Sequence, residues 1–570
     1  MSKLTVIDMF CGAGGFSEGF RQQDYDIVMG IDYWEPAIKT FNHNFNLDCV
    51  TRDVLEFEND IEKIEGLPDT DIIIGSPPCV TFSSSNISGK ADKTLGIKLT
   101  QIFLKIVAVK KWKKGSILKA WFMENVPSSI KHLGNEYTFE DLGLGDWAAM
   151  NKIGRTKVAI KLEGNQQIIN SADYGGAQSR ERVVAGEIVN KKKLIIPETT
   201  NQQDDKELKG KNLWRTLREI KKSLPNPFCT YSSRLISDPN YPELSLSLNK
   251  LTDHFYDTGL FECEWKQSRF LKTNHPYMGR MSFPENEEKP SRTITATKIG
   301  TSREALIYAS EFAREGNGKY RTPTVREAAC IMGFPITYQF IGGETTKWRL
   351  VGNAVCPSVA RAFAKQVRLE LNLKHIITPK IKLVPNLIDG NNLNTYALKQ
   401  FTSPPKRNKD SRFRRHPFKD GNITITLSNY DIVKNEKDTR IWKTSMQYGN
   451  GEGFPTFDIA DGYYKHLENS IKRSVKGLTF LQIINNGFSA KIARGNDLQN
   501  MYEIQCSKSI FLEPTLLVEK VANIIEGLKI DDKIFDQGKE NFFKDKKVVP
   551  LKQLFALYAI NKITTIANSK

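Results

Sequence analysis

Cys79 is the residue of this sequence best suited to covalent chemistry. It ends the run Ser76-Pro77-Pro78-Cys79, which follows the apolar segment DIIIG (residues 71–75). Two consecutive prolines fix the backbone and cannot continue a central strand, so we expect a rigid corner where the strand ends. A thiolate held there is a strong nucleophile. An isolated cysteine is more often a small buried hydrophobic residue, and we apply that interpretation to the other cysteines.

Three further side chains could assist such a nucleophile. Glu124 follows the apolar run AWFM (residues 120–123), and burial there would raise the pKa of its carboxyl group towards the range useful for proton donation. Arg180 and Arg182 are two residues apart and would point the same way in a strand, so they could hold a carbonyl oxygen and a phosphate. The alternatives are an N-cap or salt-bridge carboxylate for Glu124 and a solvated ion-pair strand for the two arginines.

A glycine-rich turn and two aspartates indicate a nucleoside ligand. Gly12, Gly14 and Gly15 follow a strand-like run and would let the backbone approach a ligand closely. Asp32 could accept hydrogen bonds from ribose hydroxyls, and Asp53 could accept one from an adenine amino group. The glycine spacing also occurs in dinucleotide-binding enzymes, and either aspartate could instead be a helix N-cap.

All these residues follow strand-like runs in a regular alternation of elements. The predicted strands are residues 5–10, 27–32, 71–75 and 120–123, and the predicted helices are residues 16–23, 36–44 and 102–112. This alternation is typical of βαβ units in a doubly wound, Rossmann-like α/β sheet. Ligands of such sheets bind at the carboxyl ends of the strands, which is where the candidate residues fall.

The composition is that of a soluble, basic protein of two to four domains. The chain has 570 residues, 39% hydrophobic and 26% charged, with 82 Lys and Arg against 65 Asp and Glu. The net charge of +17 would suit a nucleic acid, although many soluble proteins are simply basic. The N-terminus resembles no signal peptide, no apolar run is long enough to span a membrane, and no C-x-x-C pair occurs. We therefore expect a cytoplasmic protein without a disulfide framework or a membrane partner.

Taken together, the motifs resemble the cytosine-C5 DNA methyltransferase family of bacterial restriction-modification systems. The matching segments, in chain order, are DMFCGAGGFSEGF (8–20), Asp32, Asp53, SPPC (76–79), ENV (124–126), QSRER (178–182), RTITAT (292–297), RTPTVREAACIMGFP (321–335) and VGNAVCP (351–357). Their order and spacing match the family from the N-terminus to about residue 370.

The resemblance implies a role for each residue of the catalytic motifs. Cys79 would attack C6 of a cytosine that has been flipped out of the duplex. Glu124 would hold the N3 edge of the base and assist its protonation. Arg182 would contact O2, Arg180 would support the site, and Gln178 would orient this segment.

The resemblance also implies S-adenosylmethionine as methyl donor and no metal. The predicted cofactor-binding residues are Phe10, Gly12, Gly14, Gly15, Asp32, Tyr33, Asp53, Pro77 and Asn353. Asp32 would take the ribose, Tyr33 the adenine face and Asp53 the adenine amino group. Three departures from the family are Val80 in place of a frequent Gln, Asp32 in place of Glu, and the predicted mobile loop Ser84–Lys98, which follows the family only loosely.

The expected architecture has four parts. Residues 1–190, completed by 321–375, would form the methyltransferase domain, and residues 191–320 a smaller target-recognition domain in which basic and aromatic residues such as Trp214 and Arg215 alternate. Residues 376–420 would be a basic linker. Residues 421–570 would form a separate α/β domain, with strands at ITITL (423–427) and LTFLQII (478–484) and a helix at 514–528.

The expected activity is methylation of cytosine C5 in double-stranded DNA by a prokaryotic, nucleoid-associated enzyme. Its partners would be DNA and a cognate restriction endonuclease or other defence-system subunits. An RNA (tRNA) cytosine-C5 methyltransferase and a non-catalytic DNA-binding module are the alternatives. The C-terminal domain would be an accessory DNA-binding or partner domain, or less favourably a fused nuclease, since Asp458 and Glu503-Ile504-Gln505 loosely resemble a metal-nuclease pattern.

Overall fold

The computed structural model divides the chain into two compact units. Unit 1 comprises Met1–Leu260 and Glu264–Lys399, and unit 2 comprises Phe261–Cys263 and Gln400–Lys570. The residues described are 3–78, 93–203, 210–228, 233–273, 281–311, 317–374, 376–381, 391–394, 415–420, 423–429, 441–448, 456–504, 507–530, 534–536 and 548–569. Cys79, Val80 and the predicted loop as far as residue 92 lie outside them. Across the described ranges, we find no helix with the length and apolar character needed to cross a membrane.

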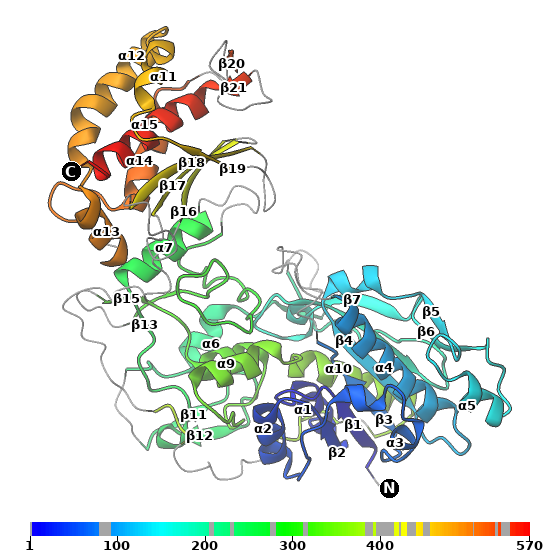
Figure 1. Ribbon diagram of the computed structural model, residues 1–570. Helices are drawn as coiled ribbons and strands as arrows, with labels where there is room; N and C mark the ends of the chain where they lie inside the picture. The colour runs from blue at the N-terminus through cyan, green and yellow to red at the C-terminus, as the bar shows by residue number, and fades with distance from the viewer. Residues whose placement is uncertain are drawn as a thin grey trace. The chain divides into compact units, whose positions relative to one another are not determined.

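A six-stranded sheet is the centre of unit 1 (Figure 1). Its strands, in spatial order, are β2 (Asp26–Ile31), β1 (Thr5–Met9), β3 (Ile72–Gly75), β4 (Ala120–Asn125), β8 (Glu181–Ile188) and β7 (Gln166–Asn170). The first four are parallel, and β8 and β7 are antiparallel to their neighbours. Since β1 lies between β2 and β3, the strand order reverses at β1, which is where sheets of this kind bind ligands.

Helices cover both faces of this sheet because successive strand residues point to opposite sides. Ile72 and Ile74 belong to the core cluster that includes residues of α1 (Gly15–Arg21), α2 (Glu35–Phe45) and α10 (Pro357–Glu370). Ile73, between them, belongs to the cluster that includes residues of α4 (Lys93–Trp112). The predicted α/β class is therefore confirmed.

Shorter elements complete the first part of unit 1. They are η1 (Val54–Phe57), α3 (Ile61–Glu65), η2 (Pro127–His132), β5 (Glu136–Thr138), α5 (Gly145–Met150), β6 (Val158–Lys161) and η3 (Ser171–Tyr174). The elements that follow are β9 (Asn201–Gln202), β10 (Asn212–Leu213), α6 (Leu217–Ser223), β11 (Leu235–Ser237), β12 (Ser245–Ser247), η4 (Leu248–Lys250), β13 (Gly259–Phe261), α7 (Glu262–Thr273), β14 (Tyr308–Ala309), β15 (Asn317–Arg321), α8 (Val325–Met332) and α9 (Glu344–Asn353).

Two sequence predictions in unit 1 are corrected. Strand β4 runs on through Glu124 and Asn125, which were expected to follow the strand. Helix α4 begins at Lys93, so residues 93–98 of the predicted loop are helical. The buried residues Leu99 and Ile102 extend the apolar stripe of the helix towards its N-terminus, and Thr100 Oγ1 donates to the carbonyl of Gly96 at 2.9 Å.

The segment 191–320 shares a core with the central sheet. Leu217, Tyr241 and Leu248 lie in the same cluster as Ile72 and Ile74. Trp214 and Arg215 make internal contacts, since the indole of Trp214 donates to Asp173 Oδ1 (2.8 Å) and Arg215 Nη1 donates to Asn240 Oδ1 (2.7 Å). These two side chains hold the segment in place.

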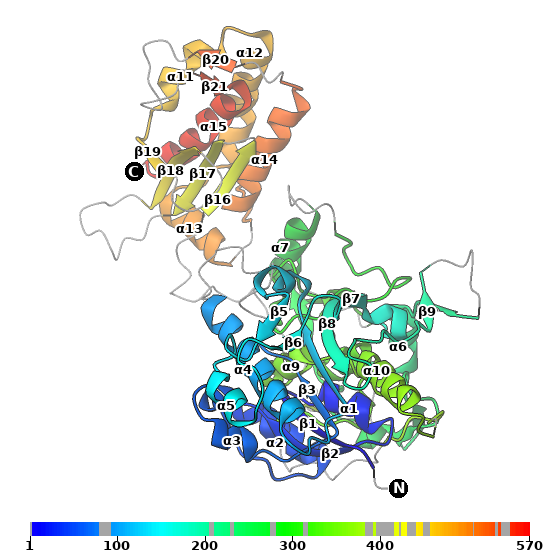
Figure 2. The ribbon, with the colours of Figure 1, turned by 90° about the vertical axis from the view of Figure 1, so that its right-hand side faces the viewer.

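Unit 2 has a four-stranded antiparallel sheet and a core of its own (Figure 2). Its strands are β16 (Arg415–Asp420), β17 (Ile423–Asn429), β18 (Trp442–Tyr448) and β19 (Thr456–Ile459). Its other elements are α11 (Tyr464–Ile471), α12 (Val475–Gln482), the π-helix η7 (Ile483–Phe488), η8 (Ser489–Lys491), α13 (Gly495–Ile504), α14 (Pro514–Gly527), the β20–β21 pair (Ile534–Asp536, Val548–Pro550) and α15 (Leu551–Ala567).

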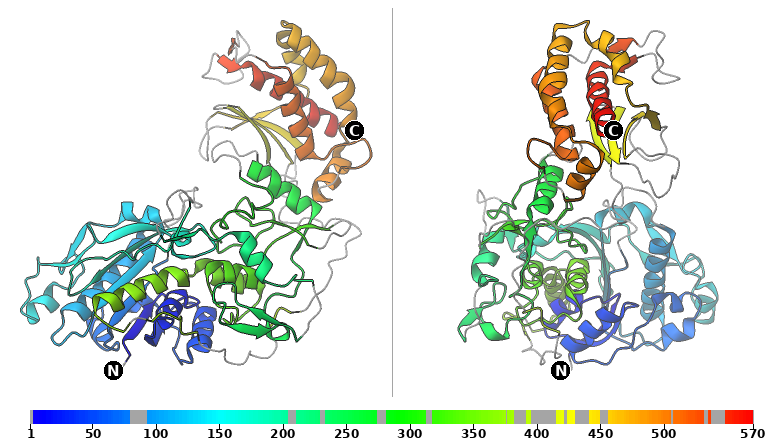
Figure 3. Two further views of the ribbon diagram at one scale, coloured as in Figure 1. Left: turned by 180° about the vertical axis from the view of Figure 1, so that it is seen from behind. Right: turned by 60° about the vertical axis from the view of Figure 1, so that its left-hand side comes forward.

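Helix α15 lies at the centre of unit 2, where it packs against β17, β18, α11 and α14 (Figure 3). Its apolar residues surround the helix, as expected for a buried one. The predicted helix at 514–528 is confirmed as α14, and the predicted strand at 423–427 lies within β17. The predicted strand at 478–484 is wrong. These residues form α12 and the start of η7, and Phe480, Leu481 and Ile484 are buried at the spacing of a helix.

Candidate active site

The turn after β1 is tight on one side and open on the other. Gly14 has a φ of +84°, and a Cβ there would lie 2.7 Å from the hydroxyl of Tyr338. A Cβ on Gly15 would lie only 2.2 Å from the carbonyl oxygen of Val355. The first turn of α1 can therefore approach the VGNAVCP segment this closely only because residue 15 is glycine. A Cβ on Gly12, at φ +51°, would meet nothing within 4 Å. The backbone at Gly12 is thus accessible to a ligand.

Asp32 joins the ends of β1 and β2. Its Oδ2 accepts a hydrogen bond from the Gly12 amide (2.9 Å), and its Oδ1 accepts one from the Trp34 amide (2.8 Å). Burial raises the pKa of this carboxyl group, and the backbone donors at Trp34 and Gly12 oppose that rise. Since a carboxylate oxygen can accept two hydrogen bonds, each oxygen retains capacity for a ligand.

The other predicted cofactor residues differ in their exposure. Tyr33 is 59% exposed, and Phe10 is buried with a φ of +59°. Asp53 is exposed, and its Oδ1 accepts from the Leu55 amide (3.0 Å) as the N-cap of η1, which is the alternative role that the sequence left open. Asn353 is exposed at the end of α9.

The proline corner is fixed to its neighbouring strands. The Ser76 amide donates to the carbonyl of Met9 (3.2 Å), and Asn125 Nδ2 donates to the carbonyl of Pro77 (3.2 Å). Pro77 is buried. The corner is therefore attached to the end of the strand that carries Glu124.

Glu124 and Arg182 form a buried ion pair. Glu124 Oε1 lies 3.1 Å from Arg182 Nε, and the two side chains are 10% and 16% exposed. Burial raises the pKa of Glu124, and the positive charges of Arg182 and then Arg180 oppose the rise. A carboxyl group in this environment can hold a proton at a higher pH than a solvated one.

Arg180 connects segments that are far apart in the sequence. Its Nη1 donates to the carbonyl of Ile294 (3.0 Å), and its Nη2 donates to the carbonyls of Gly352 (3.1 Å) and Ala354 (3.3 Å). Gln178 reinforces the arrangement, because its Oε1 accepts from the amide of Ile294 (2.8 Å). Arg180 thus holds the RTITAT and VGNAVCP segments against the sheet.

Glu124, Arg180 and Arg182 line one small pocket. Its other lining residues are Ile169, Ser171, Val355, Cys356 and Val359. Ser171 and Cys356 were not among the predicted site residues, although Cys356 lies in the VGNAVCP segment. The structure therefore brings the predicted carboxyl group and both arginines together, while Cys79 is outside the described residues.

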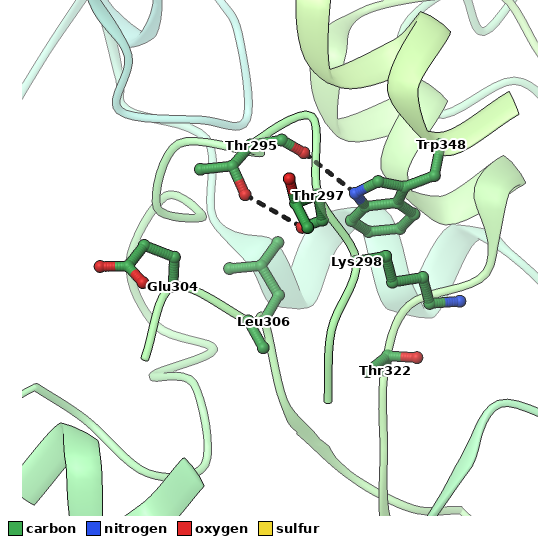
Figure 4. Close-up of a pocket in the computed structure, with 8 residues that line it drawn as sticks. Thr295, Thr297, Lys298, Glu304, Leu306, Thr322 and Trp348 are labelled. Atoms are coloured by element: carbon green, nitrogen blue, oxygen red, sulfur yellow. Dashed lines mark hydrogen bonds between the residues drawn. The ribbon is translucent and has the colours of Figure 1, made fainter. Parts of the chain in front are cut away.

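A second pocket is lined by residues of the RTITAT segment, by residues 304–306 and by Thr322 and Trp348 (Figure 4). The indole of Trp348 donates to the carbonyl of Thr295 (2.9 Å), and Thr295 Oγ1 donates to the carbonyl of Thr297 (3.2 Å). A Cβ on Gly352 would lie 2.4 Å from the carbonyl oxygen of Thr295, so α9 ends in close contact with this segment. These contacts fix the backbone next to Ile294, whose carbonyl oxygen accepts the hydrogen bond from the guanidinium group of Arg180.

Both candidate sites lie at the carboxyl ends of parallel strands, which is where α/β sheets of this kind bind their ligands. Among the residues that the structure describes, no three His, Cys, Asp or Glu side chains are grouped so that they could hold a metal ion. The sequence of most of unit 1 identifies the class of protein. The chain belongs to the C-5 cytosine-specific DNA methylase family, whose model matches residues 4–368, and is thus a DNA (cytosine-5)-methyltransferase.

Individual relatives cover the same part of the chain. The type II methyltransferase M.FnuDI of Fusobacterium nucleatum is 24% identical over 384 residues, which are 66% of this chain and 98% of the relative. The type II methyltransferase M.HgiGI of Herpetosiphon aurantiacus is 41% identical over 125 residues, which are 22% of this chain and 90% of the relative. The solved structure of the methyltransferase EhMeth of Entamoeba histolytica is 15% identical, covers 65% of this chain and 99% of that chain, and has a TM-score of 0.40. The family match ends at residue 368, before β16, which is the first strand of unit 2.

Proposed function

We propose that the chain methylates C5 of cytosine within a specific double-stranded DNA sequence, as the modification enzyme of a restriction-modification or related defence system. The observation that carries this proposal is the pocket in which Glu124, Arg180 and Arg182 meet, beside the proline corner that leads to Cys79. The family match and the type II methyltransferases among its relatives support the reaction and the biological setting.

The residues around Gly12 fit S-adenosylmethionine. The backbone of Gly12 is accessible, and both oxygens of Asp32 can accept further hydrogen bonds from ribose hydroxyls. The exposed side chains of Tyr33 and Asp53 are available to the adenine. When bound, the cofactor would supply an electrophilic methyl group. Phe10, Gly14, Gly15, Pro77 and Asn353 complete the proposed binding residues.

In the proposed reaction, the protein activates the cytosine ring. The Cys79 thiolate adds to C6 of a flipped base, and the electron pair released makes C5 nucleophilic. The protonated carboxyl group of Glu124 donates to N3 and so neutralises the charge that develops there, while Arg182 donates to O2. After C5 has gained its methyl group, loss of the C5 proton to solvent restores the double bond between C5 and C6 and expels the Cys79 thiolate. N3 then returns its proton to the carboxylate of Glu124. Arg180 positions the pocket through its contacts with backbone carbonyls.

The proposed activity also assigns a role to each of the other segments of the chain. We propose that residues 191–320 recognise the target sequence and that residues 1–190 with 321–375 carry the catalysis. The enzyme would act in the cytoplasm of a prokaryote, associated with the nucleoid. A cognate restriction endonuclease would cut the unmethylated sequence, and unit 2 would be an accessory domain.

The test supplies labelled S-adenosylmethionine together with either duplex DNA or tRNA. Label should enter only DNA, and bisulfite sequencing of that DNA should place it on cytosines of one short sequence. Glu124→Gln should lower the rate by about 10²–10⁴-fold, because it removes the proton donor at nearly constant volume. Arg155→Gln, at an ion pair with side chains 54% and 85% exposed, is the matched control and should methylate normally. Label entering only tRNA would contradict the proposed substrate.

A further inference from the structure

Helices α11 and α12 of unit 2 meet at a very tight corner. They are joined by Lys472–Ser474, and the side chain of Ser474 accepts a hydrogen bond from the Gly477 amide (3.0 Å). A Cβ on Gly477 would lie 1.8 Å from the carbonyl oxygen of Ile471, so only glycine permits this approach. A connection of three residues between two short helices has the length used in helix-turn-helix DNA-binding units.

The second of these helices has one buried face and one exposed face. Gly477, Phe480, Leu481, Ile484 and Phe488 are buried. The exposed residues, which we term the α12 face, are Val475, Lys476, Leu478, Thr479, Gln482, Ile483 and Asn486. Val475 is 81% exposed and Leu478 48%. At 3.6 residues per turn the five of these residues that belong to α12 form a single stripe along the helix. Ile483 and Asn486 are exposed in the π-helix η7, which follows directly.

The side chains of the α12 face are those that read base edges. Amides such as those of Gln482 and Asn486 bind adenine with two hydrogen bonds, and apolar groups such as Val475 contact the methyl group of thymine. Thr479 can do either. A helix also has the diameter that the major groove of DNA admits.

The charge around this face suits phosphate groups. Residues 464–494 contain six Lys and Arg but a single acid, Glu468. That acid is engaged within unit 2, since its Oε1 accepts from the Tyr558 hydroxyl (3.2 Å) and its Oε2 lies 3.4 Å from Lys472 Nζ. Lys465, Arg473 and Lys476 are exposed. Lysine and arginine side chains that flank a face without acidic residues are the arrangement expected for contacts with phosphates, which favours a nucleic acid as the partner.

The buried helix α15 holds the α12 face rigidly. The Tyr558 hydroxyl contacts Asn485 Oδ1 (3.0 Å) as well as Glu468, and Lys562 Nζ also donates to Asn485 Oδ1. Asn485 lies in the π-helix η7 that continues α12. Rigid support is what a surface that reads a sequence requires.

We propose that the α12 face is a second DNA-binding surface, which binds duplex DNA in the major groove, with Arg473 and Lys476 contacting phosphates and Gln482 and Asn486 contacting bases. Twenty residues separate Asn394, the last described residue of unit 1, from Arg415 of β16. Binding of unit 2 to DNA would therefore raise the effective concentration of unit 1 near its target. The inference does not rest on methyl transfer, because DNA binding is measured without a donor.

The experiment measures binding of the full chain to a fluorescent duplex by anisotropy at several salt concentrations. Arg473→Gln with Lys476→Gln should weaken binding roughly ten-fold and lower the slope of log K against log salt by about 1.8, or 0.9 per lost phosphate contact. The control pair is Lys508→Gln with Lys520→Gln, which are exposed elsewhere in unit 2 and should change neither quantity appreciably.

Base contacts are tested by footprinting the full chain on a long duplex. The wild-type chain should protect a second patch beyond the methylated sequence, and Gln482→Ala with Asn486→Ala should remove it, whereas Asn500→Ala with Asn523→Ala should not. Wild-type affinity, salt slope and footprint in both α12-face variants would overturn the proposal. So would a change of oligomeric state in Val475→Asp with unaltered DNA binding, because the face would then dock protein. Methylation by the same variants is assayed separately, so that failure of one proposal does not mask failure of the other.

Discussion

Removal of the Arg180 guanidinium should destabilise unit 1 as well as abolish its activity. Arg180→Met keeps most of the aliphatic side chain but leaves the carbonyls of Ile294, Gly352 and Ala354 without their charged donor. A hydrogen bond to a charged group contributes about 1.5–3 kcal/mol, and breaking a buried charged contact costs about 3–5 kcal/mol in all. We expect a loss of that size, which is a large part of the stability of an ordinary domain.

The assay is thermal unfolding of the full chain followed by tryptophan fluorescence. Seven of the eight tryptophans lie in unit 1 and only Trp442 in unit 2, so the signal reports mainly on unit 1. At about 1.2 °C per kcal/mol for a unit of roughly 400 residues, Arg180→Met should lower the Tm by roughly 4–6 °C. Arg180→Lys, whose ammonium cannot reach all three carbonyls, should recover about half of this, and Arg155→Met should change little because its ion pair is exposed. If Arg180→Met has the Tm of the wild type yet does not methylate DNA, then Arg180 acts by contacting DNA. That result would refute its role in positioning the RTITAT and VGNAVCP segments.

Three further predictions concern strand β1 and the residues that follow β1 and β2. Burial raises the pKa of Asp8 to about 7, so the stability of the folded chain falls as the pH rises from about 4 to about 7. Relative to the wild type, Asp8→Asn should therefore raise the free energy of unfolding in urea by up to about 4 kcal/mol at pH 8 and by little at pH 4. An equal effect at both pH values would contradict this prediction. Gly15→Ala should cost about 2–3 kcal/mol in urea unfolding, because its Cβ would lie 2.2 Å from the carbonyl oxygen of Val355. Gly12→Ala, with no atom near its Cβ, should cost only about 1–2 kcal/mol for its positive φ, and equal losses would argue against the close contact at Gly15. Asp32→Ala should weaken binding of S-adenosylmethionine roughly ten-fold or more by calorimetry, and unchanged affinity would exclude Asp32 from the cofactor site.

The sequence predicted the four parallel strands of the central sheet but not the antiparallel strands β8 and β7. The inner parallel strands could be predicted because they are buried on both faces. Residues 71–75 and 120–123 are nearly continuous apolar runs, and β3 and β4 lie where those runs are. Glu124 could not be placed inside β4 in this way, because a charged residue normally marks the end of such a run. Its burial depends on Arg182, 58 positions along the chain but 3.1 Å away in the structure.

Long-range contacts and helix periodicity explain what the sequence did not predict. The carbonyl partners of Arg180 are more than a hundred residues away along the chain. Because every residue has a backbone carbonyl, the sequence does not indicate which carbonyls accept these hydrogen bonds. Residues 478–484 are rich in residues that favour strands, yet Phe480, Leu481 and Ile484 continue a buried helical stripe from Gly477. The close contact of Gly477 with Ile471 fixes the helix there, and only the structure reveals it.

Cys79 is proposed to form a covalent bond with cytosine C6 during the reaction. A duplex with 5-fluorocytosine at the target position tests it directly, because a C5 fluorine cannot leave as the C5 proton does and the adduct accumulates. With S-adenosylmethionine present, the wild-type chain should yield a stable protein–DNA adduct whose peptide maps to Cys79, and Cys79→Ser should yield none. Normal methylation without an adduct, or an adduct on another thiol such as Cys356, would contradict the account.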